Sequence, residues 1–228
     1  PGLSAGWRIV DESFMSNVKV ISDLKLRASY GVVGNTSVDP YKTAGILQKS
    51  VYSWDEVDAA GFALFEIPNP TLGWEKSGTI DIGLDFGLFN GRLSGTLDVY
   101  ETNTTDLLLR RALPSSGGYN EIFQNIGDTR TRGFELTLNA NIIDSPGGFR
   151  WDADFNIASY KEEITDLGLR NAEGGKADDT GNARFIGEPI RVFYDYKKVG
   201  IWQVEEKDQA WAEMKAYPGE IKLQDTNG

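Results

Sequence analysis

Apolar and polar residues alternate along much of this chain, most clearly in the stretch TIDIGLDFGLFNGRLSGTLDVY, residues 79–100. Alternation with period two predicts β-strands that have two unlike faces. Asn90-Gly91 in the middle is typical of a two-residue hairpin turn, which fixes how the two strands pair. The apolar face then pairs Leu88 with Leu93, Phe86 with Gly95, Leu84 with Leu97, and Ile82 with Val99. A slip by one residue would move all of these side chains to the other face, so the register is well specified.

Three further stretches alternate in the same way: LKLRASYG at 24–31, GFELTLNANI at 133–142 and FRWDADFNIA at 149–158. Strands of about 9–11 residues cross a membrane when they are tilted by about 45°, whereas strands of soluble proteins more often have about 5–6 residues. The longer class fits the best-defined predicted strands, Thr79–Leu88, Arg92–Tyr100, Gly133–Ile142 and Phe149–Ala158. We predict an all-β fold with about six antiparallel strands.

The connections between these strands alternate between short and long. Asn90-Gly91 and the turn DSPGG at 144–148 are short, whereas the connections at about 32–77, 101–132 and 161–189 are long. Compact soluble domains rarely carry several loops longer than about 15 residues. Outer-membrane barrels have short periplasmic turns at one end and long extracellular loops at the other. The alternation alone fits a soluble β-sandwich as well as a transmembrane β-barrel, and the loop lengths favour the barrel.

Composition restricts the function mainly through the residue types that are missing. The chain of 228 residues has no cysteine and no histidine, which excludes a disulfide, a thiol nucleophile and a Ser-His-Asp triad. Its net charge is −11, and an acidic surface argues against nucleic acid as a partner. No apolar run of about 18 residues predicts a transmembrane helix, and no signal peptide opens the chain.

Several longer motifs, taken in order, carry a resemblance to a known family. They are LKLRASYGVVGNTSVDPY, NPTLGWEKSGTIDIGLDFGLFNGRLSGTLDVYETNTTDLLL, SSGGYNEIFQNIGDTRTRGFELTLNANI and FRWDADFNIASYKEEITDL, followed by IGEPIRVFYDYKKVGIWQ and PGEIKLQDTNG. Together they resemble the SusC/RagA family of TonB-dependent outer-membrane receptors of Bacteroidetes. The resemblance covers nearly the whole chain.

The resemblance implies a location in the bacterial outer membrane and a role in transport rather than catalysis. It implies a barrel of about 22 strands with a plugged lumen, which imports oligosaccharides or oligopeptides with energy from the TonB complex. A surface lipoprotein of the SusD type would cap the extracellular mouth. No cofactor is implied.

The resemblance also implies that residues 1–228 are part of the barrel domain, without the plug domain, the TonB box and the C-terminal strands. TonB would act through the N-terminal part that is missing here. An open arc of strands leaves unpaired edges and a lipid-facing surface in water. We therefore expect that these residues do not fold stably without the remainder of a barrel.

Carboxylates on the polar face are the first candidate site residues. In the barrel interpretation they face the lumen, and the lumen-facing set is Asp81, Asp85, Thr96, Asp98, Asp152 and Asp154. Asp85 and Asp98 are diagonal neighbours in the predicted register, about 7–8 Å apart. That spacing also fits the carboxylate pair of an inverting glycoside hydrolase, which needs about 6.5–9.5 Å, so a hydrolase is an alternative function.

Aromatic residues in the long loops are the second set of candidates. Flat rings stack on sugar faces or on peptide side chains, so we expect ligand contacts from Tyr41, Tyr52, Trp54, Tyr119 and Phe123. The alternative role of each ring is packing within its loop or against the lipoprotein. At the end of the chain, Asp225 and Asn227 match the first alternate positions of a calcium loop. The pattern is incomplete there, so we predict no metal site.

We therefore predict a segment of an outer-membrane importer that binds an oligosaccharide or peptide ligand and contacts the lipid bilayer. Two functions from other classes remain open at this point. One is a soluble secreted β-sandwich that binds glycans, and the other is the glycoside hydrolase that uses Asp85 and Asp98.

Overall fold

A computed structural model describes residues 1–36, 41–45, 47–64, 66–113 and 115–224. The chain forms two compact units, residues 1–190 and 191–228. Within the described ranges, no helix is long and apolar enough to span a membrane.

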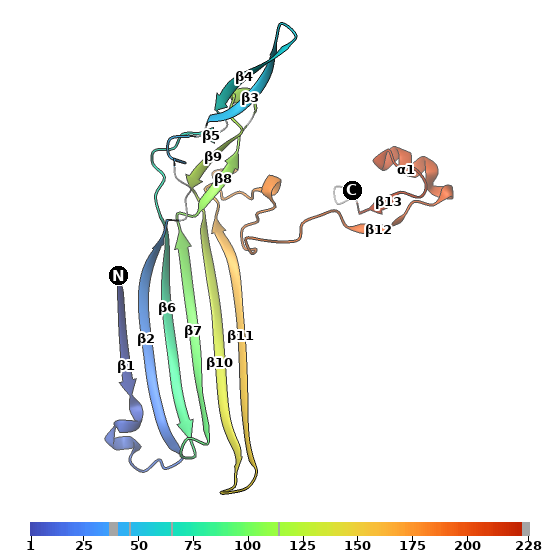
Figure 1. Cartoon of the computed structure of the whole chain (residues 1–228). Coiled ribbons are helices and arrows are strands. Elements are labelled where there is room, and N and C mark those ends of the chain that lie inside the picture. The colour runs from blue at the N-terminus through green and yellow to red at the C-terminus, as the bar shows by residue number, and fades with distance from the viewer. Residues whose placement is uncertain (37–40, 46, 65, 114, 225–228) are drawn as a thin grey trace. The chain divides into compact units, whose positions relative to one another are not determined.

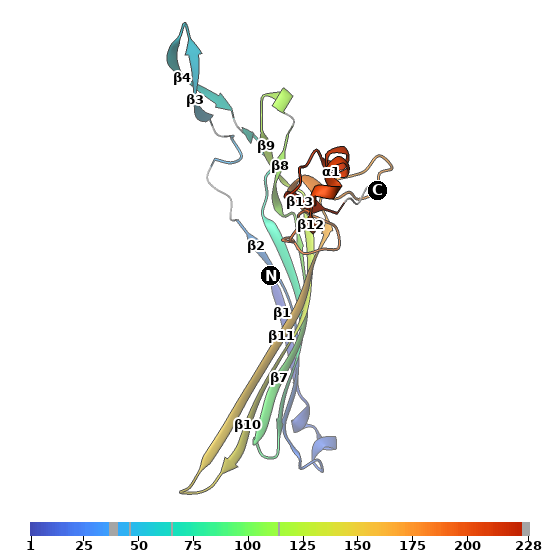
Figure 2. The same ribbon diagram turned by 90° about the vertical axis from the view of Figure 1, so that its right-hand side faces the viewer.

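The first unit is built on one sheet of six long antiparallel strands (Figure 1). The strands stand in the order β1-β2-β6-β7-β10-β11, which is also their order along the chain. Their bounds are β1 Gly2–Arg8, β2 Ile21–Asn35, β6 Glu75–Leu88, β7 Leu93–Thr105, β10 Asp128–Asp144 and β11 Arg150–Asp166. Viewed from the side, the sheet is strongly twisted (Figure 2), as expected for long paired strands. The predicted all-β fold with six antiparallel strands is confirmed.

The hairpin between β6 and β7 has the predicted register. Leu88 pairs with Leu93 and Ile82 with Val99, together with every pair between them. The turn contains three consecutive residues with positive φ: 55° at Phe89, 58° at Asn90 and 80° at Gly91. It is therefore longer than the predicted two-residue turn. Asn and Gly tolerate such left-handed angles, and this places the turn here.

The strands are longer than the predicted 9–11 residues. β6 has 14 residues, β7 has 13, and β10 and β11 have 17 each. Most of the added residues lie at the ends that lead into the long loops, where most side chains are polar or charged, and β10 also gains Ile143 and Asp144 at its short turn. These residues continue the ladder through cross-strand polar contacts, which apolar patterning does not reveal.

The long loops contain strands of their own, which the sequence pattern did not identify. β3 Leu47–Trp54 and β4 Val57–Leu64 form a two-stranded hairpin. β5 Glu66–Ile67, β9 Glu121–Asn125 and β8 Leu108–Ala112 form a small three-stranded sheet. Short 3-10 turns occur at Ile9–Asp11, Ser13–Met15, Ser115–Gly117 and Thr180–Asn182. In the small sheet β5 pairs with β9, so two loops far apart in sequence lie side by side.

The second unit is small and has its own core. It contains β12 Lys198–Ile201, a 3-10 turn at Val204–Glu206, helix α1 Lys207–Met214 and β13 Ile221–Leu223. Trp202, Ala210 and Ala216 are buried and form the centre of this unit, with Met214 packed against them. At the start of the helical segment, the Glu206 carboxylate accepts a hydrogen bond from the backbone N–H of Gln203 at 3.0 Å, and the backbone N–H of Glu206 donates to the carbonyl of Gln203 at 3.1 Å.

Candidate functional site

The six-stranded sheet has one apolar face and one polar face. Strand pairing aligns residues into rows that cross the sheet, and each row belongs to a single face because side chains alternate along every strand. On the polar face, one such row contains Arg27, Gly83, Asp98 and Glu135. All six residues expected to face a lumen lie on this face: Asp81, Asp85, Thr96, Asp98, Asp152 and Asp154. The structure therefore places them together on one surface.

Arg27 on β2 connects the two candidate catalytic carboxylates. Its Nη2 lies 2.9 Å from Asp85 Oδ1 and 2.8 Å from Asp98 Oδ1, and its Nε donates to Asp85 at 3.0 Å. The three side chains are 33%, 25% and 23% exposed. This clamp joins three neighbouring strands, β2, β6 and β7. An acid that donates a proton needs surroundings that disfavour its charge, and a shared guanidinium does the opposite.

Gly83 makes room for this clamp. It lies between Arg27 and Asp98 in the same row. A Cβ at this position would overlap Asp98 Oδ1 and would lie 2.6 Å from Arg27 Cζ. Because real side chains do not approach so closely, only glycine lets the guanidinium cross β6 to reach β7. Sequence reasoning missed Arg27 and Gly83, because it did not pair the strand at 24–31 with the hairpin.

Hydroxyl pairs continue the polar face toward the long loops. Ser77 Oγ lies 2.8 Å from Thr104 Oγ1, and Thr79 Oγ1 lies 2.8 Å from Thr102 Oγ1. At the opposite end, Asp152 accepts a hydrogen bond from Arg150 Nε at 2.8 Å. Asp154 faces Asn139 across the β10–β11 pair. The whole polar face thus offers hydrogen-bonding groups and no apolar patch comparable to the other side.

The apolar face forms a band that runs diagonally across the sheet. Its side chains remain exposed, for example 51% at Ile80 and 53% at Phe155. On β2 the apolar residue of this face closest to the long loops is Val32, and on β11 it is Ile157. Val32 is level with Glu163 through the intervening pairs, so Ile157 lies six residues lower. Six residues along a strand span about 20 Å, and the four strand spacings from β2 to β11 span about 19 Å. The upper edge of the apolar band is therefore inclined at about 45° to the strands.

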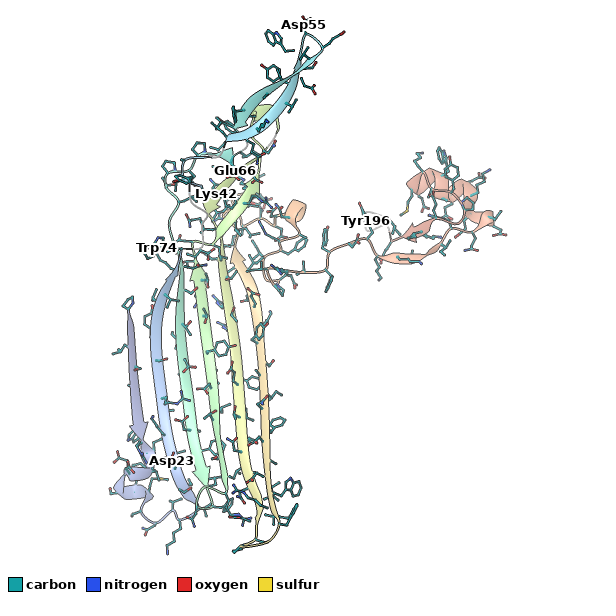
Figure 3. The ribbon with its side chains drawn as sticks, viewed as in Figure 1. Asp23, Lys42, Asp55, Glu66, Trp74 and Tyr196 are labelled. Atoms are coloured by element: carbon teal, nitrogen blue, oxygen red, sulfur yellow. The ribbon has the colours of Figure 1, made fainter. Side chains whose placement is uncertain are left out.

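Two of the candidate loop aromatics share one face of the β3–β4 hairpin. Tyr52 and Trp54 meet edge to face, with ring centroids 6.3 Å apart and an interplanar angle of 87°. Their side chains are 50% and 69% exposed. The Tyr52 ring covers Gly61 on the paired strand, at 3.0 Å from the position that a Cβ would take. The turn at Asp55 forms the tip of the hairpin (Figure 3), so both rings are accessible beside that tip.

Phe123 lies in a different environment, within the three-stranded sheet. The Nζ of Lys42 lies 4.5 Å from the centre of its ring and 2.6 Å from Glu66 Oε1. Lys42 and Glu66 are 12% and 8% exposed, and they lie close together in Figure 3. The three residues join the segment at 41–45, β5 and β9 into one structure. Phe123 therefore contributes to packing between the loops.

The remaining sequence candidates are dispersed. Tyr41 is 80% exposed and has φ 70°, and Tyr119 is half-buried in the connection between β8 and β9. Asp225 and Asn227 lie outside the described residues. Among the residues that the structure describes, no group of three or more acidic side chains is arranged to hold a metal ion.

The second unit carries aromatic residues that the sequence analysis did not single out. Trp211 and Tyr217 lie 5.4 Å apart at 49° and line a cavity of about 450 Å³ together with Lys207 and Asp208. The Glu206 carboxylate accepts hydrogen bonds from Lys222 and from the backbone of Gln203, which lowers its pKa. The alanine- and glutamate-rich stretch at 204–214 favours a helix, and it is the sequence feature that could have revealed α1 and the residues around it.

Comparisons with known proteins point in one direction. Residues 1–204 match the family model described as TonB dependent receptor-like, beta-barrel. The chain is 35% identical, over its full length, to a TonB-dependent receptor of Formosa agariphila, of which it covers 23%. It is 33% identical to TonB-dependent receptor SusC of Bacteroides thetaiotaomicron, where the match covers 87% of this chain and 21% of SusC.

Solved structures agree with these sequence matches. The chain resembles one in the structure of the RagAB peptide transporter, with a TM-score of 0.72 and 29% identity over 90% of this chain and 22% of that one. It also resembles one in the open-open state of the RagAB peptide importer, with a TM-score of 0.70 and 30% identity over 88% and 21%. The chain thus spans less than a quarter of the length of the relatives it matches.

Proposed function

Because this chain belongs to the TonB-dependent receptor-like β-barrel family, we propose that it forms part of the wall of an active importer. The six-stranded sheet is a segment of an outer-membrane β-barrel, as in SusC and RagA. The family consists of transporters and receptors rather than enzymes. We assign residues 1–228 as a whole to the barrel domain and its loops.

The observation that carries this proposal is the exposed apolar band. In the proposed barrel the band contacts lipid, and the opposite face, with Arg27, Asp85 and Asp98, borders the lumen. An inclination of about 45° agrees with the tilt of strands in outer-membrane barrels, which is about 35–45°. A soluble β-sandwich would cover the apolar face with a second sheet. The exposure of Ile80, Val99 and Phe155 at 51–54% supports the membrane interpretation.

Turn lengths set the orientation of the wall. The turns around Asn90 and Gly147 are short, and we place them in the periplasm. The connections at 36–74 and 106–127 carry β3, β4, β5, β8 and β9, and we place them outside the cell. This arrangement brings the accessible rings of Tyr52 and Trp54 to the side from which a nutrient arrives.

The proposed ligand is an oligosaccharide or an oligopeptide, bound at the extracellular side. RagAB is described as a peptide importer, and SusC is a second relative of similar identity. Tyr52 and Trp54 are the best candidates for ligand contact, and Tyr41 and Tyr119 are weaker ones. In this family the receptor pairs with a surface lipoprotein and depends on TonB, and we propose a SusD-like lid and TonB-driven import for this protein.

A hydrolase is not favoured by the geometry of the polar face. Asp85 and Asp98 share the Arg27 guanidinium, so neither carboxylate is set up as the general acid of an inverting mechanism. Replacing both by asparagine in the complete receptor should leave any glycan hydrolysis by the cells unchanged.

Uptake by intact cells tests the proposal. Cells that lack the receptor are complemented with the complete receptor, and depletion of labelled oligosaccharides and oligopeptides from the medium is followed. We expect one of the two ligand classes to be taken up, with loss of uptake when TonB is deleted. Recovery of the receptor from the soluble fraction without detergent would favour the secreted β-sandwich. Cleavage products that accumulate outside TonB-deficient cells would favour the hydrolase.

A further inference from the structure

Five charged residues stand on the apolar face, directly above the band on the three strands β7, β10 and β11. We call them the outer ionic cluster. They are Glu101, Arg130, Arg132, Lys161 and Glu163. In the proposed orientation they lie at the level of the outer leaflet, because the long loops follow on the same side. At the lower edge of the apolar face, large aromatic side chains such as Trp7, Phe149 and Trp151 are exposed.

The ion pairs of the outer ionic cluster leave positive charge in excess. Arg132 Nε donates to Glu101 Oε2 at 2.6 Å, and Glu163 pairs with Arg130 at 3.6 Å and Lys161 at 3.3 Å. Three cations therefore face two carboxylates. In a protein of net charge −11, a local excess of positive charge on a membrane-facing surface is an unusual feature.

The two most exposed cations are neighbours. Arg132 and Lys161 are paired across β10 and β11, and their side chains are 60% and 73% exposed. The contact of Arg132 with Glu101 uses Nε, and the guanidinium has further N–H donors on its two Nη atoms. A guanidinium and an ammonium side by side match the oxygens of a phosphate group.

A shallow groove joins this pair of cations to the apolar band. Its volume is about 590 Å³, and its lining includes Leu97, Val99, Phe134, Ser159, Arg132 and Lys161. The row directly below the cations contains Val99, Phe134 and Ser159, and the next row contains Leu97. Polarity thus changes from charged to apolar along the groove, within about two residue rows, or about 14 Å.

We propose that this groove binds one phosphorylated lipid of the outer leaflet. The phosphate lies between Arg132 and Lys161, and an acyl chain lies over Leu97, Val99 and Phe134. The proposal rests on the proposed function in one respect, namely that the apolar face contacts the membrane. It adds a defined ligand site on the outside of the wall, separate from the loops that would contact the nutrient.

The amphipathic character of the groove selects a lipid over a free anion. Inorganic phosphate would use the two cations but leave the three apolar side chains without a partner. A lipid without phosphate would cover the apolar residues but leave the positive excess without a counter-charge. A lipid that carries phosphate contacts both the two cations and the three apolar side chains. Basic side chains attract charged lipid headgroups most strongly when they lie close to the membrane surface.

Lipid retention by the complete receptor tests this site. Wild type, an R132Q/K161Q variant and a K25Q/R150Q control are purified from outer membranes in detergent. The control removes one lysine and one arginine from the polar face, so its charge change is matched. Each protein is placed in nanodiscs of digalactosyl diacylglycerol, a bilayer lipid without phosphate, together with a diglucosamine lipid that carries phosphate or with the same lipid after dephosphorylation. Native mass spectrometry then counts the bound diglucosamine lipids.

We expect wild type and control to retain one phosphorylated lipid, and R132Q/K161Q to retain it about tenfold less well. The dephosphorylated lipid should be retained poorly by all three proteins. Equal retention by wild type and R132Q/K161Q would overturn the site. Equal retention of both lipids would show that the groove is only an apolar surface. Displacement of the phosphorylated lipid by millimolar inorganic phosphate would show that it is a simple anion site. Either result would overturn the proposal.

The same preparations separate this proposal from the proposed function. If wild type and both variants assemble in outer membranes and import the nutrient equally, a negative lipid result overturns the lipid site alone. If the wild-type receptor is not in the outer membrane at all, the membrane orientation fails first, and the lipid site fails with it.

Discussion

The six-stranded sheet and the small unit at 191–228 differ in how far their apolar side chains are buried. In the small unit, Trp202 is 1% exposed and Ala210 is fully buried, so the chain itself removes the apolar residues at the centre of this unit from water. In the sheet, Ile82 and Val99 are 52% and 54% exposed, although their pattern is far more regular. In the proposed barrel, this regular pattern without a core suits the bilayer as a solvent.

The largest effect on the receptor as a whole should come from a charge in the middle of the apolar band, because it acts on assembly in the membrane and not on one unit alone. In the complete receptor, Leu84→Arg should prevent assembly in the outer membrane, because arginine at the bilayer midplane costs about 2–4 kcal/mol in a barrel. Thr96→Arg on the opposite face should be tolerated. The amount of receptor in outer-membrane fractions measures both. Equal levels of the two variants would show that the faces have been assigned wrongly.

The second unit should respond to loss of its core while the barrel remains intact. Trp202→Ala should destabilise this unit by about 3–5 kcal/mol, as for other buried aromatic residues. Limited proteolysis of the complete receptor should then cut within 191–228, with the strands still protected. Trp211→Ala, at a side chain that is 49% exposed, is the control and should leave the cleavage pattern unchanged. Cleavage spreading into the strands would contradict the independence of the two regions.

A smaller effect is expected from the clamp on the polar face. Arg27→Gln leaves Asp85 and Asp98 without their shared partner, which should lower the free energy of unfolding of the receptor by about 1–3 kcal/mol. Denaturant titration in detergent micelles measures the change. Adding Asp85→Asn and Asp98→Asn to the same protein should restore most of the stability. A single variant as stable as wild type would mean that the clamp has no structural role.

The smallest effect concerns acid sensitivity of the connection that follows β11. Arg170 donates to Asp166 and, with the backbone of Gly168 and with Lys176, holds the pKa of that carboxyl well below its usual range. A lowered carboxyl pKa contributes stability above the ordinary value of about 4, and this is lost as the pH falls through the folded value. Segment 166–176 should therefore stay protected from proteolysis at neutral pH.

Arg170→Gln should move the loss of protection to higher pH, toward 4. The matched control is Arg184→Gln, whose partner is Asp179 and which should leave the acid response of this segment unchanged. The same pH profile in wild type and Arg170→Gln would show that the Asp166 contact does not order the segment.

The sequence pattern predicted the parts of the fold that depend on neighbours in the chain. The 82–99 hairpin was predicted with the right register, because one turn and one alternation determine it. The strand ends were not, because residues such as Thr104 and Ser77 extend the ladder through polar contacts. Helix α1 was also missed, since its eight residues have little apolar periodicity.

The candidate site was predictable only in part, for the same physical reason. Alternation assigned Asp85 and Asp98 to one face, but it did not connect Arg27 with them. Their contact depends on pairing β2 with β6 across a long connection, which no local pattern determines. For Phe123 the sequence left ligand contact and packing both open, and its contact with Lys42 from a separate part of the chain supports packing. Whether the accessible rings Tyr52 and Trp54 touch a nutrient remains a prediction.

The diagonal course of the apolar band has a consequence for the size of the pore. A strand inclined at about 45° occupies about 6.8 Å of the barrel perimeter instead of 4.8 Å. The six strands of this chain would then cover about 40 Å, and about 22 strands would close a ring roughly 150 Å around. Such a ring is about 48 Å across between backbones, far wider than an oligosaccharide or a short peptide. In the proposed importer, such a wall alone would not hold a gradient or select a nutrient, so closure and selectivity would come from elements that fill or cover it.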